Sequence, residues 1–191
     1  MASQGTTAVD VAAAADLGSN SFHLIVARML PGEILVIDRM RERVQLAAGL
    51  GANRDVSEEA QQRATLCLER FGSHLSSLPA GHVRAVGTHT FRRARNSRAL
   101  ITRAEKALGH PIEVISGQEE ARLIFLGVAH SQAPIDGPRL VVDIGGGSTE
   151  LMKSRIFSNS SSQERIFSPD KPGAMVNCMR VRTLFGAMPS Q

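Results

Sequence analysis

The sequence contains no tryptophan and no tyrosine, and only two cysteines, Cys67 and Cys178, among 191 residues. Without Trp or Tyr the chain has few side chains that stack on bases, so specific nucleic-acid binding is not expected. Two cysteines cannot form a disulfide framework, which favours a reducing, cytoplasmic location. No apolar run has membrane length and no Lys or Arg precedes Arg28. Neither membrane insertion nor a signal peptide is therefore expected.

The positive charge of the chain is concentrated at its C-terminal end. The net charge is +4 at pH 7 and the sequence pI is about 9.8. Residues 1–150 carry 16 basic and 16 acidic side chains, whereas residues 151–191 carry 6 and 2. The high pI therefore indicates no basic surface over the patterned part of the chain. A nucleic-acid binder would have to rely on the local cluster from Arg92 to Arg103.

Apolar patterning predicts an α/β domain over residues 11–152, after a disordered lead-in at residues 1–10. The first three strands are joined by short turns, which predicts an antiparallel meander. The predicted strands are Val11–Leu17, Phe22–Arg28, Glu33–Asp38, Val83–Gly87, Pro111–Ile115 and Leu140–Val142. The predicted helices follow the N-cap Ser57, cover Ser97–Leu108 before a C-cap at Gly109, and begin near Gln118.

Two stretches share the pattern Asp, apolar residue, Gly, small residue. They are Asp16–Ser21, after the first strand, and Asp143–Glu150, after the apolar run that ends at Val142. Glycine has no Cβ, so such turns can adopt positive φ and approach a bulky anion. Their amides and hydroxyls can hold phosphate oxygens, and their aspartates can hold a divalent cation. A tight β-turn without a ligand is the alternative for each turn alone, but two of them favour one shared ligand.

Two further polar stretches follow predicted strands, where the ligands of α/β folds collect. The arginines of residues 92–98 come after Gly87, and most of them are expected on a solvated helix start. At least one is expected to face a phosphate, because a guanidinium suits bidentate oxyanion contact. Glu119 and Glu120 open the helix that follows Ile115. They either complement the helix dipole or place a carboxylate that orients and deprotonates a water, and the chemistry alone favours neither.

Four motifs together resemble the exopolyphosphatase and guanosine-pentaphosphate phosphohydrolase (Ppx/GppA phosphatase) family. They are Asp16–Ser21, Gly87–Arg92, Ser116–Ile124 and Asp143–Glu150, in the order and spacing of that family. The resemblance implies an actin-like, ribonuclease H-type domain, the first of a pair that encloses a phosphate-binding cleft. It also implies Mg²⁺-dependent removal of terminal phosphate from inorganic polyphosphate or guanosine pentaphosphate, and a homodimeric assembly.

The resemblance assigns roles residue by residue. Glu120 matches the catalytic glutamate that activates water. The implied phosphate-binding residues are Gly18, Ser19, Asn20, Ser21, Arg92, Gly145, Gly146, Gly147 and Ser148. The implied metal-binding residues are Asp16, Asp143 and Glu150. Phe22-His23 and Gly87–Thr90 look more like the exopolyphosphatase branch of the family.

The likeness to the family ends after Leu151. Residues 153–191 show no sustained period, and the charge balance changes at the same boundary. We therefore expect an irregular tail that is not family sequence, with a genuine short tail as the alternative. Without the second domain, the chain could be an inactive remnant that only binds anions. An actin-like ATPase or sugar kinase is a further alternative, but the Ser116–Ile124 motif favours the phosphatase.

Overall fold

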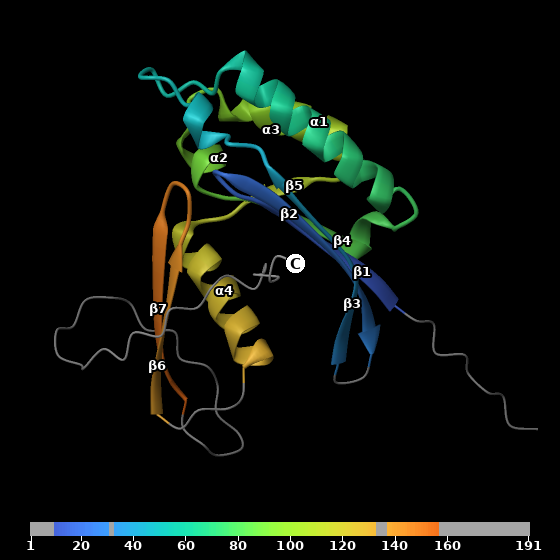
Figure 1. The fold of residues 1–191 in the computed structure, drawn as a ribbon, viewed down its shortest axis with the longest axis vertical. Coiled ribbons are helices and arrows are strands. Elements are labelled where there is room, and N and C mark those ends of the chain that lie inside the picture. Colours follow the sequence, from blue (N-terminus) through green and yellow to red (C-terminus); the bar gives the residue numbers. More distant parts are fainter. Residues whose placement is uncertain (1–9, 31–32, 133–136, 157–191) are drawn as a thin grey trace, which may run out of the picture. The chain divides into compact units, whose positions relative to one another are not determined.

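The computed structural model describes residues 10–30, 33–132 and 137–156 (Figure 1). They form two compact units, one ending at Ile115 and one beginning at Ser116. The predicted lead-in, apart from Asp10, and the predicted tail beyond Ile156 lie outside the described residues. Along the described part of the chain, no helix combines the length and the apolar character that crossing a membrane requires.

A five-stranded mixed sheet forms the first unit, with strand order β3-β2-β1-β4-β5. The strands are β1 (Asp10–Leu17), β2 (Ser21–Leu30), β3 (Glu33–Arg43), β4 (Val83–Gly87) and β5 (Ile112–Val114). Strand β2 pairs antiparallel with β1 and with β3, whereas β1 and β4 are parallel, as are β4 and β5. The predicted meander is therefore confirmed, and so is the mixed sheet of the predicted fold class.

Two long helices, α1 (Glu58–Leu75) and α3 (Ser97–Leu108), lie side by side over this sheet (Figure 1). The predicted cap is confirmed, because the Ser57 side chain accepts a hydrogen bond from the Ala60 amide. Gly109 ends α3 with a φ of 76°, as a C-cap glycine should. The helices approach so closely that a Cβ on Gly72 would lie 2.7 Å from the Leu108 carbonyl oxygen.

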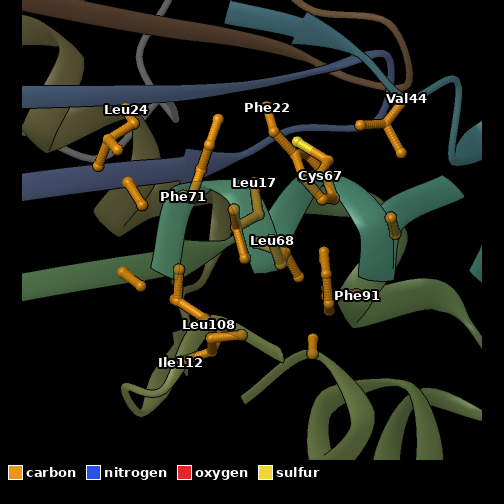
Figure 2. Packing of buried hydrophobic residues seen from close by; sticks show 14 of the residues in the cluster. Leu17, Phe22, Leu24, Val44, Cys67, Leu68, Phe71, Phe91, Leu108 and Ile112 are labelled. Carbon is orange, nitrogen blue, oxygen red and sulfur yellow. The ribbon is translucent and has the colours of Figure 1, made fainter. Parts of the chain in front are cut away.

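The core of the first unit lies between these helices and the sheet (Figure 2). Leu17 and Phe22 come from the β1–β2 hairpin, and Leu68 and Phe71 from α1; all four are fully buried. Phe91 packs against Phe22, with ring centroids 6.3 Å apart. Phe91 lies on the short helix α2 (His89–Arg93), so apolar packing fixes both the hairpin turn and the segment that carries Arg92.

Strand β3 is longer than the apolar pattern predicts. The sequence predicts strand only to Asp38, but β3 continues to Arg43, which pairs with Ser21 at the start of β2. The extension is rich in charged residues and belongs to an edge strand of the sheet, so its sequence lacks the alternation of apolar and polar residues that predicts a strand. Ladder hydrogen bonds to β2 make it a strand.

The second unit contains helix α4 (Gly117–Ser131) and an antiparallel hairpin of β6 (Gly137–Ile144) and β7 (Thr149–Ile156). The helix packs against both strands, with Ala121, Val128 and Val141 buried. Strand β6 exceeds the predicted Leu140–Val142, and Leu140 and Val142 are only half-buried, not covered on both faces. Strand β7 runs past Lys153, where the irregular tail was predicted to begin.

Two short 3-10 helices complete the described structure. They are η1 (Ala47–Gly49) and η2 (Ala80–His82). The first is separated from the end of β3 by three residues and contacts the turn between β1 and β2, because the Ala47 amide donates to the Ser19 carbonyl oxygen over 2.9 Å. This contact contributes to the geometry of the candidate site.

Candidate active site

The turn between β1 and β2 is a four-residue loop, residues 18–21, because Leu17 pairs with Phe22. The segment that follows β3 donates two hydrogen bonds to the backbone of this loop. The Ala47 amide donates to the Ser19 carbonyl, and the Gln45 amide donates to the Asn20 carbonyl over 2.8 Å. Ser19 and Ser21 are buried, whereas Asn20 is exposed. The loop is therefore rigidly supported, and its backbone and Asn20 are better placed to meet a ligand than its serine hydroxyls.

The turn between β6 and β7 has the same design. Ile144 pairs with Thr149, which leaves residues 145–148 as a four-residue loop, and the Gly145 amide donates to the Ser148 carbonyl over 2.9 Å. In each turn the Asp occupies the second-to-last strand pair, so Asp16 faces His23 and Asp143 faces Glu150. The pattern shared by the two sequence stretches thus produces one register and one loop length.

The first glycine of each turn avoids a steric conflict. Neither Gly18 nor Gly145 adopts the positive φ that glycine allows. A Cβ on Gly18 would lie 2.9 Å from the Ser21 carbonyl oxygen, and one on Gly145 would lie 3.2 Å from the Ser148 carbonyl oxygen. Glycine is needed because the carbonyl three residues later approaches its Cα closely.

Asp143 and Glu150 form a pair of carboxylates on adjacent strands. Burial raises the pKa of Asp143 above its usual value, the negative charge of Glu150 raises it further, and a hydrogen bond from the Ile144 backbone opposes both effects. Glu150 is 8% exposed, and its Oε2 atom has no hydrogen-bond partner among the described residues. Two facing carboxylates repel each other, and a buried carboxylate oxygen without a hydrogen-bond partner is energetically unfavourable.

This donor set fits Mg²⁺, which takes oxygen ligands and is commonly held by one or two carboxylates, waters and substrate phosphates. No cluster of three or more metal-binding side chains occurs within the described ranges. A magnesium ion held here would therefore depend on water and phosphate for the rest of its coordination. Asp16, the third predicted metal ligand, lies in the first unit, on β1.

Arg92 differs from the other arginines of its cluster. It is half-buried, and its Nη1 donates to the Ile115 carbonyl over 2.7 Å, while the Ile115 amide donates to the Gly87 carbonyl over 3.1 Å. Arg93 is exposed, and the Arg95 guanidinium lies 3.9 Å from Asp55 with 74% of its side chain exposed. The expectation that most of these arginines are solvated matches this geometry. A guanidinium carries five N–H donors in a planar fork, a geometry that suits phosphate oxygens.

The two glutamates at the start of α4 are Glu119 and Glu120, and hydrogen bonds from Arg122 define the surroundings of Glu119. The Ser116 side chain caps the helix by accepting from the Glu119 amide over 3.1 Å. The Glu119 carboxylate accepts two hydrogen bonds of 2.7 Å from the Arg122 guanidinium. Glu119 therefore fits the first of the two predicted roles, a charge that supports the start of the helix. Glu120 lies in the same turn and is also half-buried.

The predicted site residues fall into two sets, one in each unit. The first unit holds Asp16–Ser21 and Arg92, and the second holds Glu120 and Asp143–Glu150. Sequence reasoning missed Thr90, whose hydroxyl donates to Ser19 Oγ over 2.8 Å and connects the first loop to the helix of Arg92. Its only signal in the sequence is its place between the end of β4 and Arg92.

Comparison with known proteins agrees with these features. A model of the Ppx/GppA phosphatase family matches residues 25–163. The chain is 51% identical over 140 residues to a guanosine-5'-triphosphate,3'-diphosphate pyrophosphatase of Vibrio vulnificus, which covers 73% of this chain and 28% of that protein. It is 46% identical over 153 residues to a Haemophilus influenzae protein named "Putative exopolyphosphatase", covering 80% of this chain and 47% of that protein.

Solved structures of the family share the fold. A Cytophaga hutchinsonii exopolyphosphatase matches with a TM-score of 0.70 and 34% identity, over 76% of this chain and 46% of that one. The Aquifex aeolicus PPX-GPPA enzyme matches with a TM-score of 0.68 and 29% identity, over 77% of this chain and 49% of that one. The chain thus spans less than half the length of each of these relatives, and the predicted α/β fold class with a mixed sheet is confirmed. The chain belongs to the Ppx/GppA phosphatase family.

Proposed function

We propose that this domain takes part in the Mg²⁺-dependent hydrolysis of terminal phosphoanhydride bonds, as in an exopolyphosphatase. The observation that carries the proposal is the Asp143–Glu150 pair at the base of a glycine-rich turn. Within the part of the chain that the structure describes, one buried carboxylate oxygen of this pair has no hydrogen-bond partner. A phosphate chain with a divalent cation provides what this turn lacks: positive charge for the carboxylates and an anion for the loop amides.

The proposed metal ligands are Asp143 and Glu150 in the second unit, and Asp16 has the same proposed role in the first unit. When bound, Mg²⁺ would offset the negative charge of the phosphates and of the transition state. The backbone of residues 18–21 and of residues 145–148, together with Arg92, would bind phosphate oxygens.

Glu120 is proposed to orient the attacking water and to accept its proton. The water oxygen forms a bond to the terminal phosphorus, and the bridging P–O bond to the rest of the chain breaks. The products are orthophosphate and a chain shorter by one phosphate. No covalent intermediate with the protein is required, because charge stabilisation and positioning suffice for this chemistry.

Inorganic polyphosphate is the proposed substrate, and guanosine pentaphosphate is the second candidate. The sequence around Phe22-His23 and Gly87–Thr90 resembles the exopolyphosphatase branch, which supports polyphosphate. The 51% identity to the Vibrio vulnificus pyrophosphatase supports the guanosine compound. Burial, followed by the charge of Arg41, lowers the pKa of His23 to about 4, so this side chain is neutral at pH 7. His23 therefore adds no positive charge for either substrate.

The expected compartment is the reducing cytoplasm. Cys67 is a buried free thiol on α1, which suits that setting. Burial raises the pKa of Cys67 to about 12, so this thiol is protonated and unreactive at physiological pH. The Cys67 side chain packs in the hydrophobic core and has no role in the proposed chemistry.

The test is phosphate release from long-chain polyphosphate with Mg²⁺, compared between wild type, Glu120→Gln and Glu119→Gln. We expect Glu120→Gln to reduce release by a factor of about 10² or more, because it removes the proton acceptor. Glu119→Gln is the matched control, since it alters the neighbouring carboxylate, and its rate should stay within about threefold. Equal loss in both variants would refute the assignment to Glu120. No release from folded wild type would instead support a non-catalytic, anion-binding remnant.

A further inference from the structure

A buried hydroxyl pair connects the first phosphate loop to the helix that carries Arg92. Thr90 is 1% exposed and Ser19 is 5% exposed. The Thr90 Oγ1 atom donates to Ser19 Oγ over 2.8 Å, although the two residues are 71 positions apart in the sequence. Thr90 lies two residues before Arg92 on α2, a helix of only five residues.

Further bonds fix the two segments next to this pair. The Thr88 amide and its hydroxyl both donate to the Leu17 carbonyl, over 3.3 and 3.4 Å. The Arg92 amide donates to the Thr88 carbonyl over 3.1 Å, and the Ala94 amide to the Thr90 carbonyl over 3.0 Å. These hydrogen bonds therefore fix the start of α2 against the end of β1. The Thr90–Ser19 hydrogen bond additionally fixes loop 18–21 against α2.

We propose that Thr90 is a positioning residue that fixes loop 18–21 relative to Arg92, so that both contact the same phosphate chain. The inference rests on the proposed function of the site. Ser19 is too buried to be the outermost donor of the loop, and its hydroxyl instead anchors the loop to α2. The predicted phosphate-binding role of Ser19 thus becomes indirect. The loop amides and Asn20 meet the ligand, and Thr90 holds them in place.

Packing alone is the competing explanation for a buried threonine, and substitution can separate the two. Thr90→Val keeps the shape and the volume of the side chain but removes the donor, and leaves Ser19 Oγ without its partner. Thr90→Ser keeps the hydroxyl and loses one methyl group. If Thr90 only packs, Val should be the better substitute. If Thr90 positions the loop, Ser should be.

The test is binding of long-chain polyphosphate in the presence of Mg²⁺, measured by titration calorimetry on variants shown to be folded by thermal unfolding. We expect Thr90→Val to weaken binding about tenfold, the size typical of one hydrogen bond to a buried polar group, and Thr90→Ser to restore it. Thr65→Val is a matched control, because Thr65 on α1 also donates through its hydroxyl, to the Gln61 carbonyl over 2.8 Å. Its affinity should equal that of wild type.

A double-mutant cycle with Ser19→Ala tests whether Thr90 acts through Ser19. The double variant should bind no more weakly than Ser19→Ala alone, because both substitutions remove the same bond. Where phosphate release can be measured, KM should rise while kcat is preserved. Wild-type affinity in folded Thr90→Val, or additive losses in the double variant, would overturn the inference alone. Absence of polyphosphate binding by folded wild type would overturn the proposed function and this inference with it.

Discussion

Repulsion between the carboxylates of Asp143 and Glu150 should lower the free energy of unfolding when no metal is bound. Directly opposed side chains of an antiparallel pair have Cβ atoms about 5 Å apart. Two unit charges roughly 6 Å apart repel by about 0.7 kcal/mol at the dielectric constant of water and about 2.8 kcal/mol at an effective value of 20. Asp143 is half-buried, so solvent screens the pair and the lower part of this range applies. We expect Glu150→Gln to relieve about 1 kcal/mol of repulsion.

In EDTA at pH 7, this variant should therefore melt at a higher temperature than wild type, by about 2–4 °C. Magnesium should reverse the order, because the ion stabilises only a folded state that can hold it. At a concentration of 100 times its Kd, a bound ligand adds about 2.7 kcal/mol. The assay is thermal unfolding of both proteins in EDTA and in MgCl₂. Glu69→Gln is the control, since Glu69 is an exposed glutamate on α1.

The pH dependence gives an independent check on the same pair. The raised pKa of Asp143 means that the native state binds this proton more tightly than the unfolded state does. The free energy of unfolding should thus fall as pH rises from the ordinary value of 3.8 through the raised value. In Glu150→Gln this loss should be smaller. Lower stability of the variant in EDTA, or an equal response of both proteins to Mg²⁺, would refute the reasoning.

Two further predictions concern the first unit. Arg92→Lys should raise KM for polyphosphate about tenfold in the phosphate-release assay, because an ammonium group lacks the planar fork that can bind a phosphate and the Ile115 carbonyl together. Arg93→Lys is the control, and at its exposed position it should change KM less than twofold. Gly18→Ala should lower the free energy of unfolding in urea by about 1–3 kcal/mol, since its Cβ would meet the Ser21 carbonyl. Gly81→Ala, where a Cβ meets nothing within 4 Å, should cost less than about 0.5 kcal/mol, and equal losses at both glycines would contradict the steric argument.

The elements that could be predicted from the sequence are those with strong local signals. Ser57 before two glutamates, and Gly109 after an apolar stripe, set the ends of α1 and α3 where the structure has them. The three-strand meander followed from apolar runs separated by turn residues. The charged end of β3 could not be predicted in this way, because its pairing with β2 is a tertiary contact that no local pattern encodes.

The candidate site shows the same limit. The repeated pattern at Asp16 and Asp143 predicted two equivalent turns, and their register confirms the equivalence. The partner of Glu119 depends on where Arg122 directs its guanidinium, which the order of residues in the sequence does not reveal. The bond from Thr90 to Ser19 spans 71 positions and depends on the alignment of β4 beside β1.

The shared design of the two turns has an electrostatic consequence. Each turn presents one aspartate at the same point of the same backbone, and the residue across the ladder decides the total charge. Opposite Asp16 stands His23, which is uncharged at neutral pH because its pKa is about 4, whereas Asp143 faces a second carboxylate. One cross-strand position thus gives two turns of the same backbone different charges: one carboxylate at the first turn and two at the second, where a divalent cation would offset more negative charge.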